Sequence, residues 1–458
     1  MTTPVDHHLP QFHLRLPRGY LNDPNGPIDL DGEAHLYFQS RPRVDLDVPV
    51  EWGHATSDDL VRWTLHRPAL VPVPGGPDSG GAWSGNTVLH DGTVRAYYSG
   101  KADDDSPFQS VLLAESHDGG ATFGAPVQVV DDPSADEAIT MFRDPFVWRD
   151  EEGWSLAVGA ASADQTASVR HYRSDDGVSW RHVGDLVSMP RDTIDGIDTG
   201  EGWECPQILT VDGADVALVA SWSHAGGPGD VLAIPLGGEP HPTRVDDGHG
   251  FYAASVLRAS SWGPVLFGWV REGRTQQWTE EAGWSGAISL PRRAWLRGGR
   301  LATAPHPSVD SLRLGAPRRG RGAAIGARAE IVLPDATTGQ IRLRFSETEH
   351  LDVHVDAEGD LLTIERTRAS TDPRAERSAA TATAAFDPST GLPAVRVFVD
   401  GSIIEVFTSA GRSLTTRVYP TTAPPWTVEA AEDVMVWGLA AVFETGPASA
   451  ADADDEVA

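Results

Sequence analysis

The chain of 458 residues is longer than one hydrophobic core usually supports, so its length predicts two domains. Its formal net charge of −30, from 66 acidic and 36 basic residues, argues against nucleic acid or anionic lipid as a partner, because both are bound through Lys and Arg. The 47 Gly and 34 Pro, which lie between short apolar runs, favour strands and turns over helices.

The N-terminal segment shows no targeting pattern. Its first 20 residues lack the basic stretch and apolar run of a signal peptide, and no apolar stretch approaches the ~20 residues that span a bilayer. The single cysteine, Cys205, excludes an intrachain disulfide. These features predict a cytoplasmic protein.

Three segments in the first 180 residues share one pattern, in which an apolar strand ends in Ser, a turn follows, and an aromatic residue opens the next strand. Ser57, Ser116 and Ser174 mark the pattern and lie 59 and 58 residues apart. A period near 58 filled with short strands is typical of four-stranded propeller blades, and about 295 residues would hold five of them. A β-sandwich whose hairpins resemble one another by chance is the alternative.

From about residue 300 the pattern changes to runs that alternate apolar and polar residues. The expected strands are 329–333, 340–346, 351–356, 360–367, 394–409, 414–420 and 433–442. Asp400-Gly401 divides the longest run and predicts a hairpin turn. The chain is therefore predicted to be all-β, with a five-bladed β-propeller in residues 1–300, a C-terminal β-sandwich in 301–447 and a disordered acidic tail in 448–458.

Three carboxylates occur at intervals that match the repeat. Asp23 lies in GYLNDPNG, Asp144 in FRDPF and Glu204 in WECPQI. Taken singly, the two Asp-Pro sequences are common turns and a buried Glu could pair with an Arg. However, Asp23 and Asp144 are 121 residues apart, Asp144 and Glu204 are 60 apart, and Trp83-Ser84-Gly85 falls in the same phase between them. Residues in one phase of successive blades point toward the common axis, so the carboxylates should converge and their pKa values should split.

Two carboxylates in one aromatic pocket are typical of a glycosidase. Trp52, Trp83, Phe142 and Trp203 lie next to the acidic motifs. Each could stack on a sugar ring or could pack the core.

At this point a family resemblance becomes clear. YLNDPNG, QSRP (39–42), WGHATS (52–57), WSGN (83–86), FRDP (142–145) and WECP (203–206) resemble, in order, the motifs of glycoside hydrolase family 32, the invertases, levanases and inulinases. GWSGAISLPR (283–292) is similar to the segment that closes that family's propeller. DGSIIEVF (400–407) and RVYP (417–420) resemble its C-terminal sandwich.

The resemblance implies roles for individual residues. Asp23 would be the nucleophile, Glu204 the acid/base and Asp144 the stabiliser of the transition state. Cys205 would tune the acid, unless it is only a small buried residue. The fructosyl ring would be bound by Asn22, Gln39, Trp52, Trp83, Ser84 and Arg143.

The implied activity is retaining hydrolysis of β-D-fructofuranosides by double displacement, with sucrose, sucrose 6-phosphate or short fructo-oligosaccharides as substrates and no cofactor or metal. Retention predicts carboxyl groups of Asp23 and Glu204 roughly 5–5.5 Å apart. The alternatives are a fructosyltransferase with the same site, a non-catalytic sugar-binding protein, and an inverting arabinanase. The expected partner is a small carbohydrate, without nucleic acid or membrane, and no oligomeric state follows from the sequence.

Some positions depart from the family pattern. Tyr20-Leu21 replaces Trp-Met, Gln207 stands where Asp often follows Glu-Cys-Pro, and Gly250 takes the second acidic position in DDGHGFYA. Because Asp247 and Tyr252 remain nearby, we expect an altered pocket rim with the chemistry retained. A substrate phosphate could be contacted by arginines that flank the first motifs, although such residues are often solvated or paired with surface acids; they are Arg15, Arg18, Arg41 and Arg43.

Overall fold

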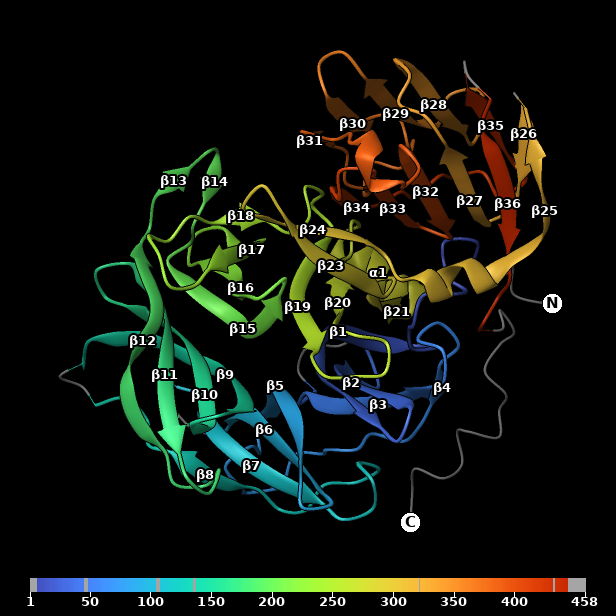
Figure 1. Cartoon of the computed structure of the whole chain (residues 1–458). Helices are drawn as coiled ribbons and strands as arrows, with labels where there is room; N and C mark the ends of the chain where they lie inside the picture. The colour runs from blue at the N-terminus through green and yellow to red at the C-terminus, as the bar shows by residue number, and fades with distance from the viewer. Residues whose placement is uncertain are drawn as a thin grey trace, which may run out of the picture.

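A computed structural model describes residues 6–44, 48–103, 108–134, 137–320, 322–430 and 433–443. It contains two β domains, a ring of five sheets followed by a pair of stacked sheets (Figure 1). The acidic tail predicted at 448–458 lies outside the described residues. Within these ranges no helix is long and apolar enough to cross a membrane.

The ring consists of five antiparallel sheets, which are the blades of a propeller. Blade 1 contains β1 (Gly19–Leu30), β2 (Glu33–Arg41), β3 (Glu51–Ser57) and β4 (Thr64–Leu65). Blade 2 contains β5 (Gly81–His90), β6 (Thr93–Lys101), β7 (Ser110–Ser116) and β8 (Val127–Val130). Blade 3 contains β9 (Ile139–Asp150), β10 (Gly153–Ser162), β11 (Thr166–Ser174) and β12 (Arg181–Pro190).

The last two blades are less regular. Blade 4 contains β15 (Gly202–Val211), β16 (Ala214–Ser223), β17 (Gly227–Pro235) and β18 (Thr243–Arg244), and a small hairpin precedes it, β13 (Thr193–Ile194) with β14 (Ile197–Asp198). Blade 5 contains β19 (Phe251–Leu257), β20 (Val265–Val270), β22 (Ala287–Ile288), β23 (Arg292–Arg297) and β24 (Arg300–Pro305). Helix α1 (Gln276–Ala282) interrupts the fifth blade.

The first strand of each blade lies innermost. β1, β5, β9, β15 and β19 each contact the next, and β19 contacts β1, so the five strands form a closed ring around the axis. The ring is also closed within blade 1, where β21 (Trp284–Ser285) pairs in parallel with Gly19 and Tyr20. The predicted five-bladed propeller is thus confirmed.

The repeat recognised in the sequence corresponds to the third strand of a blade. Ser57, Ser116 and Ser174 end β3, β7 and β11. Each Ser Oγ donates to the Asp two positions later, at 3.2, 2.7 and 2.9 Å respectively. The sequence repeat is therefore a repeated turn in which the serine hydroxyl and the aspartate side chain bond to each other.

Every innermost strand has a bulge at the same level. The register with the second strand shifts between Leu21 and Pro24 in blade 1, between Ala82 and Gly85 in blade 2, and at equivalent points in the other three blades. A bulge redirects side chains and increases the local twist. At three bulges the backbone has positive φ at a residue other than Gly; these are Asp144 (64°), Cys205 (48°) and Ala253 (48°).

The C-terminal domain is a sandwich of two six-stranded sheets. One sheet has the order β25 (Arg313–Arg319), β36 (Met435–Leu439), β27 (Arg328–Leu333), β32 (Val395–Asp400), β33 (Ile403–Thr408), β34 (Ser413–Arg417). The other has the order β26 (Ala323–Ile325), β35 (Trp426–Ala430), β28 (Gly339–Arg344), β29 (His350–Asp356), β30 (Leu361–Glu365), β31 (Ala379–Thr383). Two 3₁₀ helices complete the domain, η2 (Pro307–Leu312) and η3 (Pro388–Thr390).

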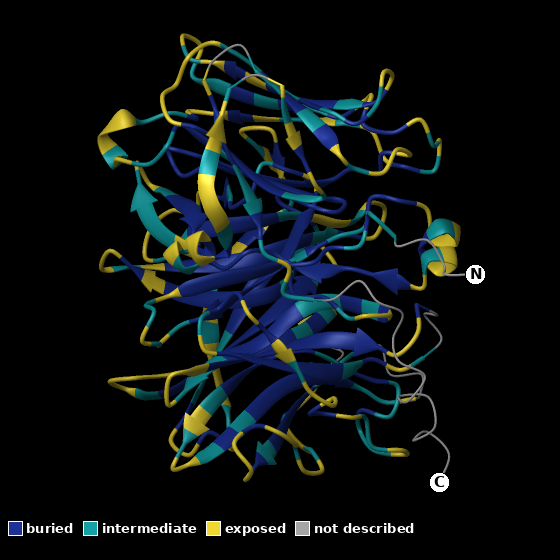
Figure 2. Cartoon of the chain, turned by 90° about the vertical axis from the view of Figure 1, so that its right-hand side faces the viewer, coloured by how far each residue is buried: buried dark blue, intermediate teal, exposed yellow. Residues whose placement is uncertain are grey.

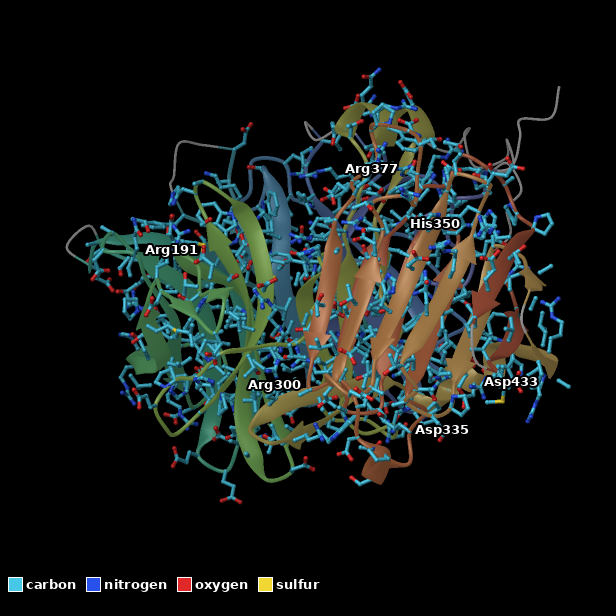
Figure 3. All side chains as sticks on the ribbon, turned by 90° about the horizontal axis from the view of Figure 1, so that it is seen from above. Arg191, Arg300, Asp335, His350, Arg377 and Asp433 are labelled. Carbon is cyan, nitrogen blue, oxygen red and sulfur yellow. The ribbon has the colours of Figure 1, made fainter. Side chains whose placement is uncertain are left out.

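The core of the sandwich lies between its sheets and is formed by apolar side chains such as Ile331, Leu343 and Val406. Figure 2 shows buried strands in the middle of both domains and exposed loops at their edges. Figure 3 views the molecule from above, with Arg191 on the propeller and Asp433 at the far side of the sandwich. The division predicted at residue 300 remains a prediction, and β24, which begins there, still pairs with β23 of blade 5.

A buried charged network joins the two domains. His13, from the segment before β1, lies 2.9 Å from Asp400 Oδ2 and 3.0 Å from Glu405 Oε2, and all three side chains are inaccessible to solvent. Arg292 of β23 donates to Glu405 Oε1 at 2.5 Å and to Asp246 Oδ2 at 2.8 Å. Such groups tolerate burial only because each charge is paired and hydrogen-bonded.

Candidate active site

The three predicted carboxylates meet at the propeller axis, each on the innermost strand of a different blade. Asp23 lies on β1, Asp144 on β9 and Glu204 on β15. Cys205 Sγ lies 3.7 Å from Asp23 Oδ2 and 3.6 Å from Asp144 Oδ2, and so links two of these blades. The bulges in these strands are what turn the carboxylates toward the axis.

Asp23 is held through one oxygen. Its Oδ2 accepts a hydrogen bond from Ser84 Oγ at 2.7 Å and one from Gln39 Nε2 at 3.3 Å. Gln39 Nε2 also donates to Ser84 Oγ. Two neighbouring blades therefore fix the orientation of this carboxylate.

Asp144 is the most buried of the three carboxylates, and its residue is only 2% exposed. The Cys205 amide donates to Asp144 Oδ2 at 2.9 Å, and Arg143 Nε donates to Oδ1 at 3.4 Å. The Asp144 amide donates to Ser99 Oγ at 2.6 Å. The positive φ at Asp144 and at Cys205 brings these main-chain groups into position.

Glu204 has a partner on each oxygen. Arg143 Nη1 lies 3.0 Å from Oε1, and the Tyr252 hydroxyl donates to Oε2 at 2.8 Å. The Glu204 side chain is 13% exposed, so its carboxyl group borders solvent. Sequence reasoning kept Tyr252 only as a rim residue, because its contact with Glu204 depends on how blades 4 and 5 pack together.

The surroundings change the protonation of Asp23, Glu204 and Cys205. Burial raises the pKa of Asp23 to about 7, with help from the charges of Glu204 and Asp144 and against the hydrogen bond from Ser84. Burial also raises the pKa of Glu204, an effect that the charge of Arg143 opposes. Burial raises the pKa of the Cys205 thiol, which therefore stays protonated. Two neighbouring carboxyl groups, Asp23 and Glu204, thus both hold their protons to higher pH than usual.

The aromatic residues considered for sugar binding differ in how far they are exposed to solvent. Trp83 is partly exposed, and its ring lies beneath the guanidinium of Arg143, with 5.6 Å from Cζ to the ring centroid. Trp52 is fully buried, and its indole Nε1 donates to the Trp83 carbonyl at 2.8 Å. Phe142 and Trp203 are also fully buried. Of the two alternatives left open for Phe142 and Trp203, the structure supports core packing. Trp52, proposed from the resemblance to bind sugar, instead supports Trp83 through its hydrogen bond.

Three polar atoms at this centre have no hydrogen-bond partner among the described residues, although they are buried. They are Asn22 Oδ1, Gln39 Oε1 and Trp83 Nε1. Buried polar atoms are normally satisfied, so unpaired ones on residues next to the carboxylates in the chain or in contact with them leave hydrogen bonds that a ligand could supply. Two acceptors and one donor beside the carboxylates fit the hydroxyl groups of a sugar.

A cavity of about 350 Å³ adjoins the Glu204 side of the centre. Tyr20, Trp269 and Arg271 are among its lining residues, and Glu376 of the sandwich lines it as well. The Trp269 ring lies 6.4 Å from that of Tyr252, and the Arg271 guanidinium lies over the Tyr252 ring at 5.3 Å. The cavity is therefore one residue away from Glu204. Across the described residues, no group of three or more His, Cys, Asp or Glu side chains has the arrangement of a metal site.

Two positions expected at the pocket rim belong instead to the contact between the domains. Asp247 pairs with Arg412 of the sandwich. The Gly250 amide donates to the Thr415 carbonyl at 2.9 Å, and a Cβ at Gly250 would approach that oxygen to 2.9 Å. The missing second carboxylate of DDGHGFYA is thus explained by close packing of the sandwich, although His249 of the same segment lines the cavity.

The four arginines considered for phosphate contact lie in different places. Arg41 lies over the rings of Tyr20 and Trp83, at 5.4 and 5.8 Å. Arg15 is 2% exposed and donates to the Pro10 carbonyl, away from the carboxylates. Arg18 and Arg43 line a separate cavity. Only Arg41 is therefore close to the catalytic centre.

Comparison with known proteins gives the same assignment over nearly the whole chain. The model of the glycosyl hydrolases family 32 N-terminal domain matches residues 13–305, and that of the family 32 C terminal matches 302–436. The chain is 30% identical over 454 residues to a raffinose invertase of Escherichia coli and 27% identical over 458 residues to a sucrose-6-phosphate hydrolase of the same species; each alignment covers 90% of this chain and 89% of the relative.

Solved structures agree on the fold. Sucrose-6-phosphate hydrolase from Lactobacillus gasseri has a TM-score of 0.81 at 23% identity, covering 95% of this chain and 94% of that one. A Bombyx mori GH32 β-fructofuranosidase in complex with sucrose has a TM-score of 0.80 at 23% identity, covering 96% and 95%. Since both family models match in order and together cover most of its length, this chain belongs to glycosyl hydrolase family 32.

Proposed function

We propose that the chain is a retaining β-fructofuranosidase that releases fructose from sucrose-type β-D-fructofuranosides. The observation that carries this proposal is the meeting of Asp23, Asp144 and Glu204 from three blades, with Arg143 and Tyr252 on the two oxygens of Glu204. The printed names of its Escherichia coli relatives, raffinose invertase and sucrose-6-phosphate hydrolase, support the same substrate class.

In the first step, ionised Asp23 attacks the anomeric carbon and the bond to the leaving oxygen breaks. The contacts of Asp23 with Ser84, Gln39 and Cys205 all fall on Oδ2, so we assign the attack to Oδ1. Protonated Glu204 gives its proton to the leaving oxygen, and the raised pKa of this carboxyl favours the protonated form.

In the second step, Glu204, now ionised, takes a proton from water, and the resulting hydroxide attacks the fructosyl ester of Asp23. Fructose leaves and both carboxyl groups return to their starting states. Asp144, fixed by the Cys205 amide, is assigned to stabilise the positive charge that develops on the ring. The unpaired atoms of Asn22, Gln39 and Trp83 would bind the fructosyl hydroxyls.

The leaving group is assigned to the cavity beside Tyr252, because the acid that protonates it borders that side. Arg271 and Arg274 line this cavity, but Glu272 and Glu376 do so too. Positive and negative side chains are therefore balanced, which favours an uncharged glucosyl unit over a phosphorylated one. The cytoplasmic location expected from the sequence remains a prediction, to be tested by cell fractionation.

The first test is fructose release from sucrose by the parent chain and by Asp23→Asn. We expect release by the parent and a loss of several orders of magnitude in the variant. Asp150→Asn is the matched control, because Asp150 is the last residue of β9, six residues after Asp144, and pairs with Arg173. Undiminished release by Asp23→Asn would contradict the assignment of the nucleophile.

Stereochemistry and substrate charge are tested separately. With methanol as acceptor, retention predicts methyl β-D-fructofuranoside as the product, whereas the α-anomer would exclude double displacement. We also expect kcat/KM to be higher for sucrose than for sucrose 6-phosphate. The reverse order would assign a phosphate contact to Arg271 or Arg41.

A further inference from the structure

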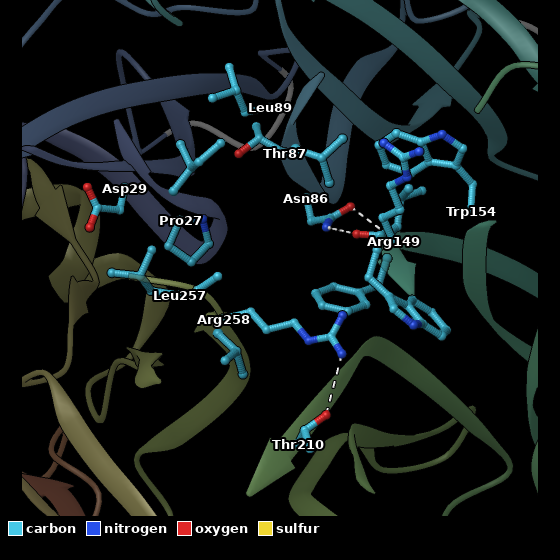
Figure 4. Close-up of a pocket in the computed structure, with 17 residues that line it drawn as sticks. Pro27, Asp29, Asn86, Thr87, Leu89, Arg149, Trp154, Thr210, Leu257 and Arg258 are labelled. Atoms are coloured by element: carbon cyan, nitrogen blue, oxygen red, sulfur yellow. Dashed lines mark hydrogen bonds between the residues drawn. The ribbon is translucent and has the colours of Figure 1, made fainter. Parts of the chain in front are cut away.

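A second cavity lies at the other end of the propeller axis (Figure 4). Its volume is about 520 Å³, and all five innermost strands or the residues directly following them line it. In each innermost strand, the residues that line this cavity come after the position of the catalytic carboxylates. Pro27 follows Asp23 by four residues, and Trp148 follows Asp144 by four. At roughly 3.3 Å per residue, Pro27 and Trp148 lie at most about 13 Å along their strands from the catalytic carboxylates, and Asn86, two residues after Ser84, lies closer.

This rear cavity contains two guanidinium groups. Arg258 lies over the Trp148 ring at 5.9 Å, and Arg149 lies over the Trp154 ring at 5.6 Å. Figure 4 shows Arg258 extending across the cavity, with one nitrogen toward Thr210, where Nη2 is 3.4 Å from Oγ1. Within the described ranges, neither arginine forms an ion pair with a carboxylate.

Among the described residues, many arginines, unlike Arg258 and Arg149, form an ion pair with a carboxylate. The chain has 66 acidic and 36 basic residues, and arginines elsewhere, such as Arg173, Arg292 and Arg342, have carboxylate partners within 3 Å. Arg258 is also partly desolvated, since burial lowers its pKa in spite of the more distant charges of Asp215 and Asp150. A desolvated guanidinium without an anion is costly unless a ligand supplies one.

The acidic and polar groups around the cavity are already occupied. Asp29 accepts hydrogen bonds from the amides of Gly32 and Ser261 and from the Ser261 hydroxyl. Asn86 bonds in both directions with the main chain of Val147, at 2.8 Å each, and Thr87 Oγ1 donates to Gly26. Little hydrogen-bonding capacity therefore remains for the many hydroxyl groups of a sugar.

The rest of the wall is apolar. Ile28, Val88, Phe146 and Leu257 line it, and Leu89, 54% exposed, stands at the edge. An apolar wall combined with two guanidinium groups that have no carboxylate partner among the described residues matches a molecule that has an apolar body and an anionic head. A neutral apolar molecule would leave the arginines unpaired, and inorganic phosphate alone would leave the wall uncovered.

We propose that this rear cavity is a second binding site, distinct from the sugar site, for a small amphipathic anion whose carboxylate or phosphate is held by Arg258 and Arg149. The site rests on geometry that the hydrolytic reaction does not use. It does not depend on the function proposed above.

The test is calorimetric titration of the full chain with octanoate, octyl phosphate, octanol and inorganic phosphate. We expect saturable binding of both octyl anions, with an affinity at least tenfold higher than that of octanol or inorganic phosphate. The stronger of the two octyl anions identifies the preferred head group. Saturating sucrose should not displace either ligand.

Variants test the two arginines directly. Arg258→Gln should weaken binding of the octyl anions about tenfold, and the double variant with Arg149→Gln should weaken it further. Arg191→Gln is the matched control, because Arg191 pairs with Asp198 and Glu201 away from the cavity. Thermal unfolding and sucrose hydrolysis, both unchanged, would show that the variants are folded.

Several outcomes would overturn the proposal. These are no saturable binding of octyl anions at millimolar concentration, equal affinity for octanol and octanoate, or undiminished binding in the double variant. Displacement by sucrose would place the ligand in the catalytic centre and would also contradict it.

Discussion

The main-chain amide of Cys205 donates a 2.9 Å hydrogen bond to Asp144 Oδ2, so the residue that follows the proposed acid on one blade orients the carboxylate of the preceding blade. The bond requires the left-handed backbone of Cys205, with φ of 48°. The side chain of Cys205 makes weaker contacts than its amide: the sulfur lies 3.7 Å from Asp23 Oδ2 and 3.6 Å from Asp144 Oδ2.

The first prediction therefore separates the thiol from the amide. Cys205→Ala keeps the main-chain bond to Asp144, and we expect it to lower the kcat for sucrose by less than about tenfold, the range of one weak hydrogen bond. Steady-state kinetics provide the measurement. A thousandfold loss would mean that the sulfur itself takes part in the reaction.

The second prediction concerns the hydroxyl of Tyr252. Its hydrogen bond to Glu204 stabilises the ionised carboxylate and so lowers the pKa of that group. In Tyr252→Phe the pKa of Glu204 should rise, and the alkaline limb of the kcat/KM profile should move to higher pH. Tyr172→Phe is the control, because Tyr172 lies on β11 away from Glu204. A general loss of activity without a shifted limb would indicate a structural role only.

The third prediction concerns the acid limb of the same profile. Asp23 must be ionised to attack, and its pKa is raised to about 7, chiefly by burial and next by the charge of Glu204. Activity should therefore decline as pH falls through about 7, well above the usual pKa of an aspartate. The measurement uses an aryl fructoside, whose leaving group needs no proton, so that the limb does not report on the acid. A limb centred near the usual aspartate pKa of about 4 would contradict this prediction.

The fourth prediction concerns stability and rests on Glu405 at the domain contact. Its pKa is lowered to about 2, because the charges of Arg292 and His13 and their hydrogen bonds outweigh burial. A lowered carboxyl pKa stabilises the folded state above the unfolded value near 4.5, and the contribution is lost as pH falls toward 2. Urea unfolding should show this loss in the parent chain.

Glu405→Gln tests the same network at neutral pH. It leaves Arg292 with one fewer carboxylate and His13 with only Asp400, and breaking a buried pair costs about 3–5 kcal/mol. The free energy of unfolding of this variant should fall by that amount at pH 7 and should vary less between pH 5 and 2. An unchanged free energy would mean that the network contributes nothing net.

Much of the fold follows from local patterns. The runs predicted in the second domain correspond to β27, β28, β29, β30, β34 and β36, and Asp400-Gly401 separates β32 from β33 as expected. Strands β25, β26, β31 and β35 were not predicted. Two of these have little apolar pattern: β25 is mostly exposed, and β31 has the sequence AATAT. Such strands form because a neighbouring strand offers free hydrogen bonds, which no local sequence signal records.

The catalytic centre was predictable for a different reason. Asp23, Asp144 and Glu204 occupy the same position in successive repeats, which can be seen in the sequence alone. Because the blades close into a ring, residues at that position lie close together at the axis. Contacts that depend on how different layers pack were not predictable. Asp247 was expected near the pocket rim, because nothing in its own segment indicates its partner. That partner is Arg412, which lies 165 residues later and pairs with the Asp247 carboxylate.

The parallel pairing of β1 with β21 has a consequence for the order in which the protein is made. Gly19 and Tyr20 obtain these partners only from Trp284 and Ser285, and Gly286 lies so close to the Leu21 carbonyl that a Cβ there would overlap it. The strand that carries Asp23 is thus synthesised among the first, and more than 260 further residues must follow before Gly19 and Tyr20 gain their second strand partner. Until then an unpaired strand edge is open to other chains. A truncation before residue 284 should accordingly yield aggregates, even though all three carboxylates are already present in the shortened chain.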